Sequence, residues 1–328
     1  MTTRGSPLSL FEKFDKTLKK IKKLSKLQKI LFVFLVLVFS AFFINDIFEL
    51  GILPTFDDIT HTLLIDSTEK LPYETQVHII DVGQGDCILL QQGNSYALID
   101  AGERTQGEVV VQYLRQQGVE KLDYVIVSHM HTDHMGGMQA VIENFEVGVI
   151  ILPDMSLVPT PTAPTVINFL TAVEKSNCEI TVANSGNTYL LGSGQISIVT
   201  VGIKSDNQNN NSVGVLFQAE GLSFLNTGDG EREYEQNLLR TVSLPQVDIF
   251  NAGHHGSYTS NTPELIYTIM PNYITVSCSA NNDYGHPHRE PMQLFSEINA
   301  TVLRTDQNGS IVFAVDDTGE ILVFTERE

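Results

Sequence analysis

The stretch that most constrains this chain is "SHMHTDHMGG" (128–137), which holds three histidines and an aspartate within six positions. The whole chain has only nine histidines in 328 residues. The stretch follows "LDYVIVS" (122–128), an apolar run typical of a strand that is buried on both faces. Gly136 and Gly137 then let the chain turn tightly into a helix. Since buried imidazoles and carboxylates are costly when unpaired, this pattern predicts a metal site rather than a histidine-rich polar turn.

The order of the histidines and the aspartate in the motif indicates which side chains share a metal ion. His129 and His131 can turn to one metal, while Asp133 and His134 address another. The end of a strand positions such a loop rigidly, as a metal site requires.

Three other strand-end loops carry the same residue types. "FLNTGDG" contains Asp229, "FNAGHHGSYTS" contains His254 and His255, and "YGHPHREP" contains His286 and His288. Each loop alone is a weak signal, because a Gly-Asp-Gly sequence is usually only a turn. Their joint placement after predicted strands favours one shared site.

The rest of the body alternates short β-rich runs with turns and helical patterns. Helices are predicted over 108–117, 138–145 and 166–175, and the asparagine-rich 206–212 is predicted to be a loop. Two sheet-rich halves, each with helices, predict a sandwich of two mixed sheets covered by helices. The predicted strands are 76–81, 86–90, 95–100, 122–128, 147–152, 179–183, 195–201, 213–219, 222–228, 247–250, 273–278, 300–304, 310–315 and 320–324.

Charge separates an N-terminal segment from the body. Residues 1–29 have a net charge of +7 and residues 30–44 have none. Because the whole chain has a net charge of −19, residues 45–328 must carry −26. The apolar run 30–44 makes roughly 22 Å of helix at ~1.5 Å per residue, and its flanks extend it toward the ~30 Å of a bilayer core. We expect a transmembrane signal anchor over 30–50, followed by a linker over 51–75.

A cleaved signal peptide is the alternative, and it would make the body a secreted protein. The long leader and the lack of an A-x-A-like cleavage site favour the anchor. The positive-inside rule then places the basic leader in the cytoplasm and the acidic body outside a single-pass cell membrane protein.

The motifs together resemble a known family. "HMHTDH", "LIDAG" (98–102), "TGD" (227–229) and "GHHGS" (253–257) are similar to the metallo-β-lactamase superfamily. "DVGQGDCILL" (81–90), "GHHGS" and "YGHPH" (284–288) resemble, more narrowly, the extracytoplasmic hydrolase domain of ComEC-type competence proteins. The resemblance covers residues 76–328 and implies an α/β fold, a four-layer αβ/βα sandwich with a two-metal site.

The resemblance also implies a ligand set for two divalent metal ions, with zinc expected and manganese as the alternative. His129 and His131 would bind the first metal, and Asp133 and His134 the second. Asp229 would bridge both ions. The remaining assignments are His255 as the last ligand of the second metal, His254 as its less favoured neighbour, and Asp100 as the residue that orients ligands by hydrogen bonding.

One position departs from the family. Many members supply a further histidine to the first metal before the Gly-Asp turn, whereas this chain has "NNNSVGV" there, with Asn211 and Ser212. The first site is therefore expected to be weaker, or completed by water or substrate.

Catalytic and substrate roles are assigned to other loop residues. Asp133 and His286 are the catalytic candidates, with His286 as a general acid or a contact to the developing oxyanion. His288 is the second choice for that role. The residues expected to border the cleft or line the pocket are Asp81, Gln84, Asp86, Ser257 and Tyr258.

These assignments predict a dinuclear-metal phosphodiesterase or nuclease outside the cytoplasmic membrane, linked to DNA uptake, with single-stranded DNA as one substrate. A body charge of −26 opposes nonspecific attraction to DNA. The alternatives are therefore a hydrolase of small or wall-linked phosphodiesters, such as phosphorylcholine esters, and a non-catalytic metal-binding component of an envelope assembly. A β-lactamase is disfavoured by the three ComEC-like loops, and no obligate protein partner is inferred.

Overall fold

The computed structural model describes residues 70–159, 161–176 and 178–327. Two compact units divide the chain, Met1–Leu64 and Ile65–Glu328. The predicted leader and anchor, and the linker up to residue 69, lie outside the described residues. Within the described part of the chain, no helix is both long enough and apolar enough to cross a membrane.

Two mixed sheets form the centre of the described domain. The first has the strand order β15 (Ile321–Thr325), β14 (Ile311–Val315), β1 (Thr75–Ile79), β2 (Ile88–Gln92), β3 (Ser95–Ile99), β4 (Lys121–Ile126), β5 (Glu146–Leu152) and β6 (Glu179–Val182). The second has the order β13 (Thr301–Arg304), β12 (Tyr273–Val276), β11 (Ile249–Asn251), β10 (Leu222–Asn226), β9 (Gly214–Ala219), β8 (Gly194–Thr200) and β7 (Thr188–Leu191). Pairing is parallel from β3 to β6 and from β10 to β13, and antiparallel elsewhere.

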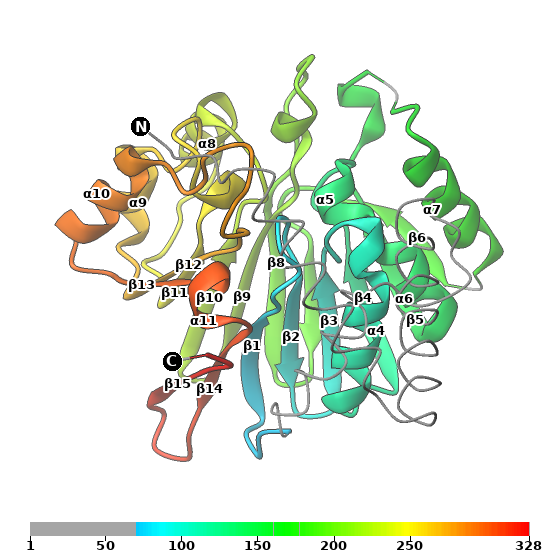
Figure 1. Ribbon diagram of the computed structural model, residues 1–328, viewed down its shortest axis with the longest axis horizontal. Helices are drawn as coiled ribbons and strands as arrows, with labels where there is room; N and C mark the ends of the chain where they lie inside the picture. Colours follow the sequence, from blue (N-terminus) through cyan, green and yellow to red (C-terminus); the bar gives the residue numbers. More distant parts are fainter. Residues whose placement is uncertain (1–69, 160, 177, 328) are drawn as a thin grey trace, which may run out of the picture. The chain divides into compact units, whose positions relative to one another are not determined.

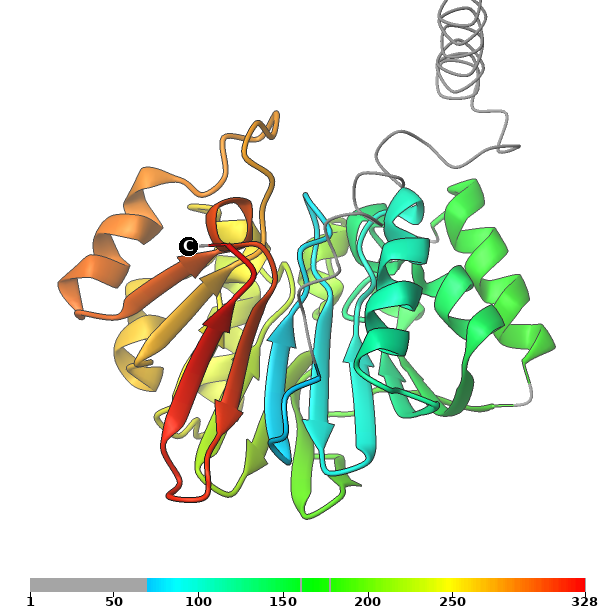
Figure 2. The same cartoon turned by 60° about the horizontal axis from the view of Figure 1, so that its bottom comes forward.

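Helices cover the outer face of each sheet, and Figures 1 and 2 show the sheets between them. The first sheet is covered by α4 (Gly107–Gln116), α6 (Met138–Asn144) and α7 (Pro164–Lys175). The second is covered by α8 (Arg232–Thr241), α9 (Pro263–Ile269) and α10 (Arg289–Glu297). The short helices are α5 (Thr132–Met135) and α11 (Thr305–Asn308). The predicted αβ/βα sandwich is therefore the observed fold.

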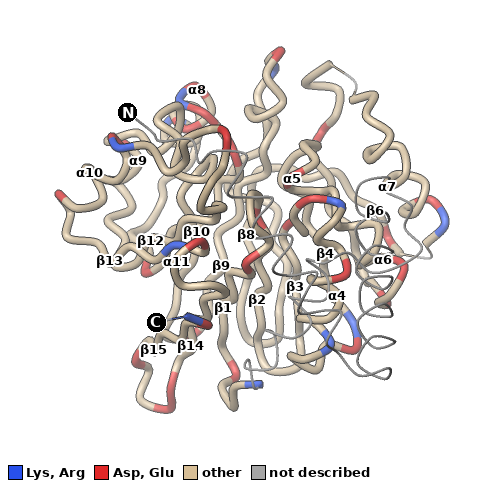
Figure 3. Tube along the Cα trace, in the orientation of Figure 1, with Lys and Arg blue, Asp and Glu red and all other residues tan. Residues whose placement is uncertain are grey.

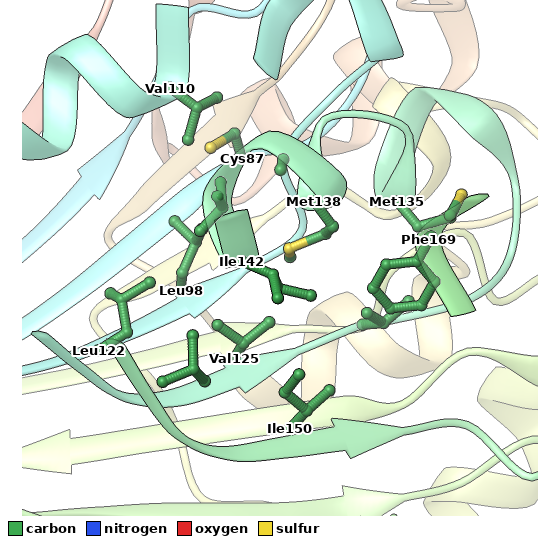
Figure 4. Close-up of a cluster of buried hydrophobic side chains, with 14 of the residues drawn as sticks. Cys87, Leu98, Val110, Leu122, Val125, Met135, Met138, Ile142, Ile150 and Phe169 are labelled. Carbon is green, nitrogen blue, oxygen red and sulfur yellow. The ribbon is translucent and has the colours of Figure 1, made fainter. Parts of the chain in front are cut away.

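Alternating side chains divide the apolar residues among three cores. On β3, Ala97 and Ile99 pack between the sheets, whereas Leu98 packs outward against the helices. Figure 4 shows this outer core, in which Leu98 lies near Val125 and Met138. Because a strand's side chains alternate between its faces, one apolar strand contributes both to the core between the sheets and to the core under the helices.

Two local predictions differ from the structure, and one is confirmed with an addition. β7 was not predicted. Gly136 and Gly137 form the predicted turn into helix α6, but a short helix, α5, already begins at Thr132, and both glycines keep helical φ values of −58° and −77°. A Cβ on either glycine would clash with the backbone of Ala101 or Arg104, so close packing requires them. The asparagine-rich segment is a buried 3-10 turn, Gln208–Asn211, rather than a plain loop.

Candidate metal centre

The predicted site residues follow the carboxyl ends of parallel strands in both sheets. Asp100 follows β3, the histidine motif follows β4, and Asp229 follows β10. The two remaining histidine pairs follow β11 and β12. Since the carboxyl ends of neighbouring parallel strands lie at the same edge, residues far apart in sequence meet there.

The larger group of donors, called the four-donor cluster here, contains Asp133, His134, Asp229 and His255. Its ligand atoms all lie within 4.8 Å of one another. His255 Nε2 is 3.4 Å from Asp133 Oδ2, and His134 Nε2 is 3.1 Å from Asp229 Oδ1. One cation can therefore be reached by all four side chains.

The smaller group, the three-donor cluster, contains His129, His131 and Asp229, again with ligand atoms within 4.8 Å. His129 Nε2 and His131 Nδ1 lie 3.1 Å apart, and His129 Nε2 is 3.8 Å from Asp229 Oδ2. Asp229 Oδ1 lies near His134, whereas its Oδ2 lies 3.8 Å from His129 Nε2 and 3.7 Å from His255 Nε2, so both clusters share this carboxylate.

Orphaned polar atoms show that these residues fit metal ions. His134 Nε2, His255 Nε2 and Asp229 Oδ1 are buried without a hydrogen-bond partner among the described residues. Such atoms are costly in a folded protein unless something satisfies them. Imidazole nitrogens and carboxylate oxygens are ligands for divalent transition metals, so the site can hold a dinuclear metal centre.

Electrostatics point to the same conclusion. Burial by itself lowers the pKa of His134, but the carboxylates of Asp229 and Asp133 overcome this and raise it well above its usual value. The pKa of His255 rises to about 9, since Asp229 and other carboxylates outweigh its burial. The four-donor cluster therefore attracts positive charge strongly. The pKa of His129 is instead lowered by burial, which leaves that imidazole neutral.

Asp100 holds the histidine motif in place. Its carboxylate accepts hydrogen bonds from the Ser128 backbone N–H at 2.8 Å and from His134 Nδ1 at 2.9 Å. The Ser128 hydroxyl also donates to it, and lies 3.0 Å from His129 Nδ1. Ser128 therefore links both clusters, and sequence reasoning missed it. Its place directly before His129 was the only signal.

His255, rather than His254, belongs to the four-donor cluster. Its Nδ1 donates to the Ser277 carbonyl at 3.0 Å, which leaves Nε2 for a metal. His254 Nε2 is also 3.7 Å from Asp229 Oδ2, but the His254 side chain is 20% exposed, against 2% for His255, and it does not join the group of four mutually close ligand atoms. Ser257 binds Thr259, so it shapes this loop from within.

The "DVGQGD" loop packs against the site. Asp86 is 1% exposed, accepts a hydrogen bond from Asn251 Nδ2, and lies 3.7 Å from His255 Nδ1. Gln84 accepts a hydrogen bond from the Ser279 backbone. Asp81 accepts hydrogen bonds from the Arg327 guanidinium and the N–H of Gly83. Asp86 therefore lies next to the metal ligands, whereas Asp81 is engaged in an ion pair; a role of either at a substrate cleft stays a prediction.

His286 and His288 do approach the site. The His286 ring centroid lies 5.3 Å from that of His254 and 5.9 Å from that of His255. Burial, reinforced by the neighbouring histidines, lowers the pKa of His286 to about 4, so its imidazole is neutral at pH 7. This favours a contact to an oxyanion over a general acid. His288 Nδ1 accepts a hydrogen bond from the Tyr258 backbone.

The segment that lacks the extra histidine supports Asp229. The Ser212 hydroxyl accepts a hydrogen bond from the Asp229 N–H at 3.1 Å and donates to the Asn209 carbonyl. Asn211 is fully buried, and neither polar atom of its amide has a hydrogen-bond partner in the described residues. The Ser212 hydroxyl thus holds the backbone of Asp229, the residue that both donor clusters share.

The sequence is similar to a family of known proteins and to individual relatives. The sequence model of the Metallo-beta-lactamase superfamily matches residues 80–279. The chain is 30% identical over 264 residues to ComE operon protein 3 of Bacillus subtilis, covering 74% of this chain and 33% of that protein. It is 26% identical over 258 residues to Competence protein ComA of Neisseria gonorrhoeae, covering 75% and 33%. The chain spans about a third of the length of these relatives.

Among solved structures, a variant of the CmlA beta-hydroxylase shares the fold, with a TM-score of 0.50 and 14% sequence identity. The match covers 75% of this chain and 55% of that one. The two-sheet sandwich, the paired donor clusters and the family match lead to one conclusion: the chain belongs to the metallo-β-lactamase superfamily and is homologous to ComE operon protein 3 and ComA-type competence proteins.

Proposed function

We propose that the chain is a dinuclear-metal phosphodiesterase or nuclease that acts outside the cytoplasmic membrane. The observation that carries this proposal is the pair of donor clusters that share Asp229. When bound, two divalent cations, zinc or manganese, supply activation of water and neutralise charge on a phosphoryl group.

The chain's own residues divide the remaining work. The Asp133 side chain is 23% exposed, whereas those of His134, Asp229 and His255 are at most 3% exposed. Asp133 is therefore the member of the four-donor cluster that substrate meets first, and it orients the attacking water. His286, as a neutral imidazole, donates its ring N–H to the phosphoryl oxygen on which charge develops.

Charge limits the choice of substrate. Acidic residues are spread over many elements of the domain (Figure 3), and the chain beyond residue 44 carries −26. Duplex and single-stranded DNA both normally bind a basic groove, so this charge favours a smaller phosphodiester, and of the two DNA forms it disfavours the single strand less because its charge density is lower. The names of the relatives support a link to DNA uptake. The acidic charge supports, as a second candidate, wall-linked or small phosphodiesters such as phosphorylcholine esters.

The activity test uses the full-length chain after chelation and reloading with Mn²⁺ or Zn²⁺. Single-stranded DNA, duplex DNA, bis-nitrophenyl phosphate and a phosphorylcholine ester are compared, with Asp229→Asn as the control. Metal-dependent cleavage of a phosphodiester is expected. Tight metal binding without cleavage of any of these substrates would instead support the non-catalytic alternative.

The proposed location rests on the basic leader and the apolar run 30–44, which would form an anchor over 30–50 and attach the protein to the cytoplasmic membrane. Protease added to intact spheroplasts should digest residues 76–328. Protection of this body until the membrane is opened would contradict the topology.

A further inference from the structure

Two tyrosines beside the metal centre leave most of their surface in solvent. Tyr258 is 58% exposed and Tyr284 is 66% exposed. Tyr258 belongs to the loop that follows His255, and Tyr284 precedes His286 in the loop between β12 and α10. That second loop projects beyond the strand ends in Figure 2. A tyrosine ring is apolar with one polar tip, so exposed rings beside the metal ligands are available to contact a ligand there.

A line of ring contacts connects these tyrosines to the metal ligands. Tyr284 is stacked on His286, with centroids 5.6 Å apart and an interplanar angle of 22°. His286 in turn lies 5.9 Å from His255, a member of the four-donor cluster. The ring centroids of Tyr258 and His288 lie 4.8 Å apart, and those of His288 and His286 lie 4.9 Å apart. A group bound against Tyr284 is therefore only two ring-to-ring steps from the metal centre.

A buried polar atom accompanies these rings. His286 is 9% exposed, and its Nδ1 has no hydrogen-bond partner among the described residues. The same side chain thus presents one face to Tyr284 and an unsatisfied nitrogen next to it. A ligand with a flat ring and polar atoms beside it could stack on the exposed ring of Tyr284 and hydrogen-bond to this nitrogen.

We propose that Tyr258 and Tyr284 form a stacking platform that binds an unpaired nucleobase while the adjoining phosphodiester lies at the metal centre. This inference rests on the proposed phosphodiesterase function. Every base has a π-face that can stack on an aromatic ring, but in a duplex both faces are already covered by neighbouring base pairs. The platform therefore selects single strands. It also supplies affinity that does not depend on phosphate charge, which suits an acidic domain.

A quaternary ammonium group such as choline is the other ligand that aromatic rings recognise. Such a cation is held most strongly over ring faces that are shielded from water. Both tyrosines are more than half exposed, so they offer open faces rather than an enclosure. The geometry points to a base.

The test measures binding by the full-length chain, using short single-stranded oligonucleotides and matched oligonucleotides with abasic sites. The chain has no tryptophan, so the emission of its ten tyrosines reports base stacking directly. The wild type is expected to bind the base-containing strand roughly tenfold more tightly, given about 1–3 kcal/mol per stacked base. This preference should persist after metals are chelated and should depend weakly on salt.

Variants assign the preference to the platform. Tyr284→Ala and Tyr258→Ala should each reduce the preference for bases, whereas Tyr284→Phe should keep it because the π-face remains. Tyr267→Ala is the matched control, since Tyr267 is 53% exposed but lies on α9, where its hydroxyl meets Glu297. In the metal-loaded enzyme, Tyr284→Ala should raise KM for single-stranded DNA by a larger factor than it lowers kcat.

Equal affinity of the wild type for base-containing and abasic strands would overturn the platform. A preference for a phosphorylcholine ester that is lost in both alanine variants would also overturn it, in favour of a cation site. Base-dependent binding without cleavage of any phosphodiester would uphold the platform and refute the proposed function instead.

Discussion

The two donor clusters share Asp229 but differ in how the fold builds them. The three-donor cluster takes His129 and His131 from one loop of the first sheet. The four-donor cluster joins Asp133 and His134 from that loop to His255 from the second sheet. Both clusters take Asp229 from the second sheet, but only the four-donor cluster takes a second donor, His255, from it. Metal affinity should follow this difference, because each additional protein donor strengthens binding.

Removing the shared carboxylate should have the largest effect. Asp229→Asn takes the bridging charge from both clusters, so turnover should fall to background while the fold remains. Metal content by elemental analysis and circular dichroism would be measured together with activity. Near-wild-type turnover in a folded, metal-loaded variant would show that Asp229 is not the bridge.

Removing one histidine from each cluster should separate them. His134→Ala should abolish turnover and the tighter metal equivalent, because it breaks the four-donor cluster and the contact to Asp100. His131→Ala should remove the weaker equivalent and leave the tighter one in place. Calorimetric titration of each apo variant shows which metal equivalent is lost. If both variants lost the same equivalent, the division into two clusters would be contradicted.

The wild-type clusters should load unequally, with the four-donor cluster filling first. Titration of the apo protein, with calorimetry and elemental analysis, should resolve a tight and a weak equivalent. Two equally tight equivalents would mean that another residue completes the three-donor cluster. A single equivalent with full activity would refute the two-metal mechanism.

Lower pH should weaken the four-donor cluster selectively. The pKa of His255 is raised to about 9 and that of His134 is raised well above its usual value, whereas that of His129 is lowered. Protons on the first two must leave before a metal binds, so affinity should drop about tenfold per pH unit for each displaced proton. Titrations between pH 6 and 9, in buffers of different ionisation enthalpy, would detect the released protons. A pH-independent tight equivalent would contradict this assignment.

Supplying the missing histidine should have the smallest effect. Asn211→His is expected to strengthen the weak equivalent, by about tenfold or less, if the new ring reaches the three-donor cluster. Asn211 is fully buried and lies against Gly202, so the larger ring has little room. Asn211→Ala is the control for lost packing. An unchanged weak equivalent in a folded Asn211→His protein would show that this segment does not reach the metal.

The sequence predicted most of this fold because its signals are local. Apolar runs such as 122–128 define buried strands, and their alternation with helical patterns predicts a layered sandwich. β7 was missed because it has only four residues, of which Thr188 and Leu190 are exposed and Tyr189 is only partly buried, and its sequence TYLL lacks the apolar–polar alternation of a half-buried strand. The donors in "HMHTDH" could also be predicted from a local signal, because they lie close together in the sequence and follow one strand.

What the sequence determined alone is the supply of ligands, because residue type and position after a strand are local properties. Only the tertiary structure decided which atoms meet. It drew Asp81 to Arg327, buried Asp86 beneath His255, and placed Ser128 between Asp100 and His129. Asp81 and Asp86 owe their positions to partners more than a hundred residues away. The position of Ser128 depends on the direction in which the backbone leaves β4. The close approach of two sheets fixes such contacts, and no short stretch of sequence encodes it.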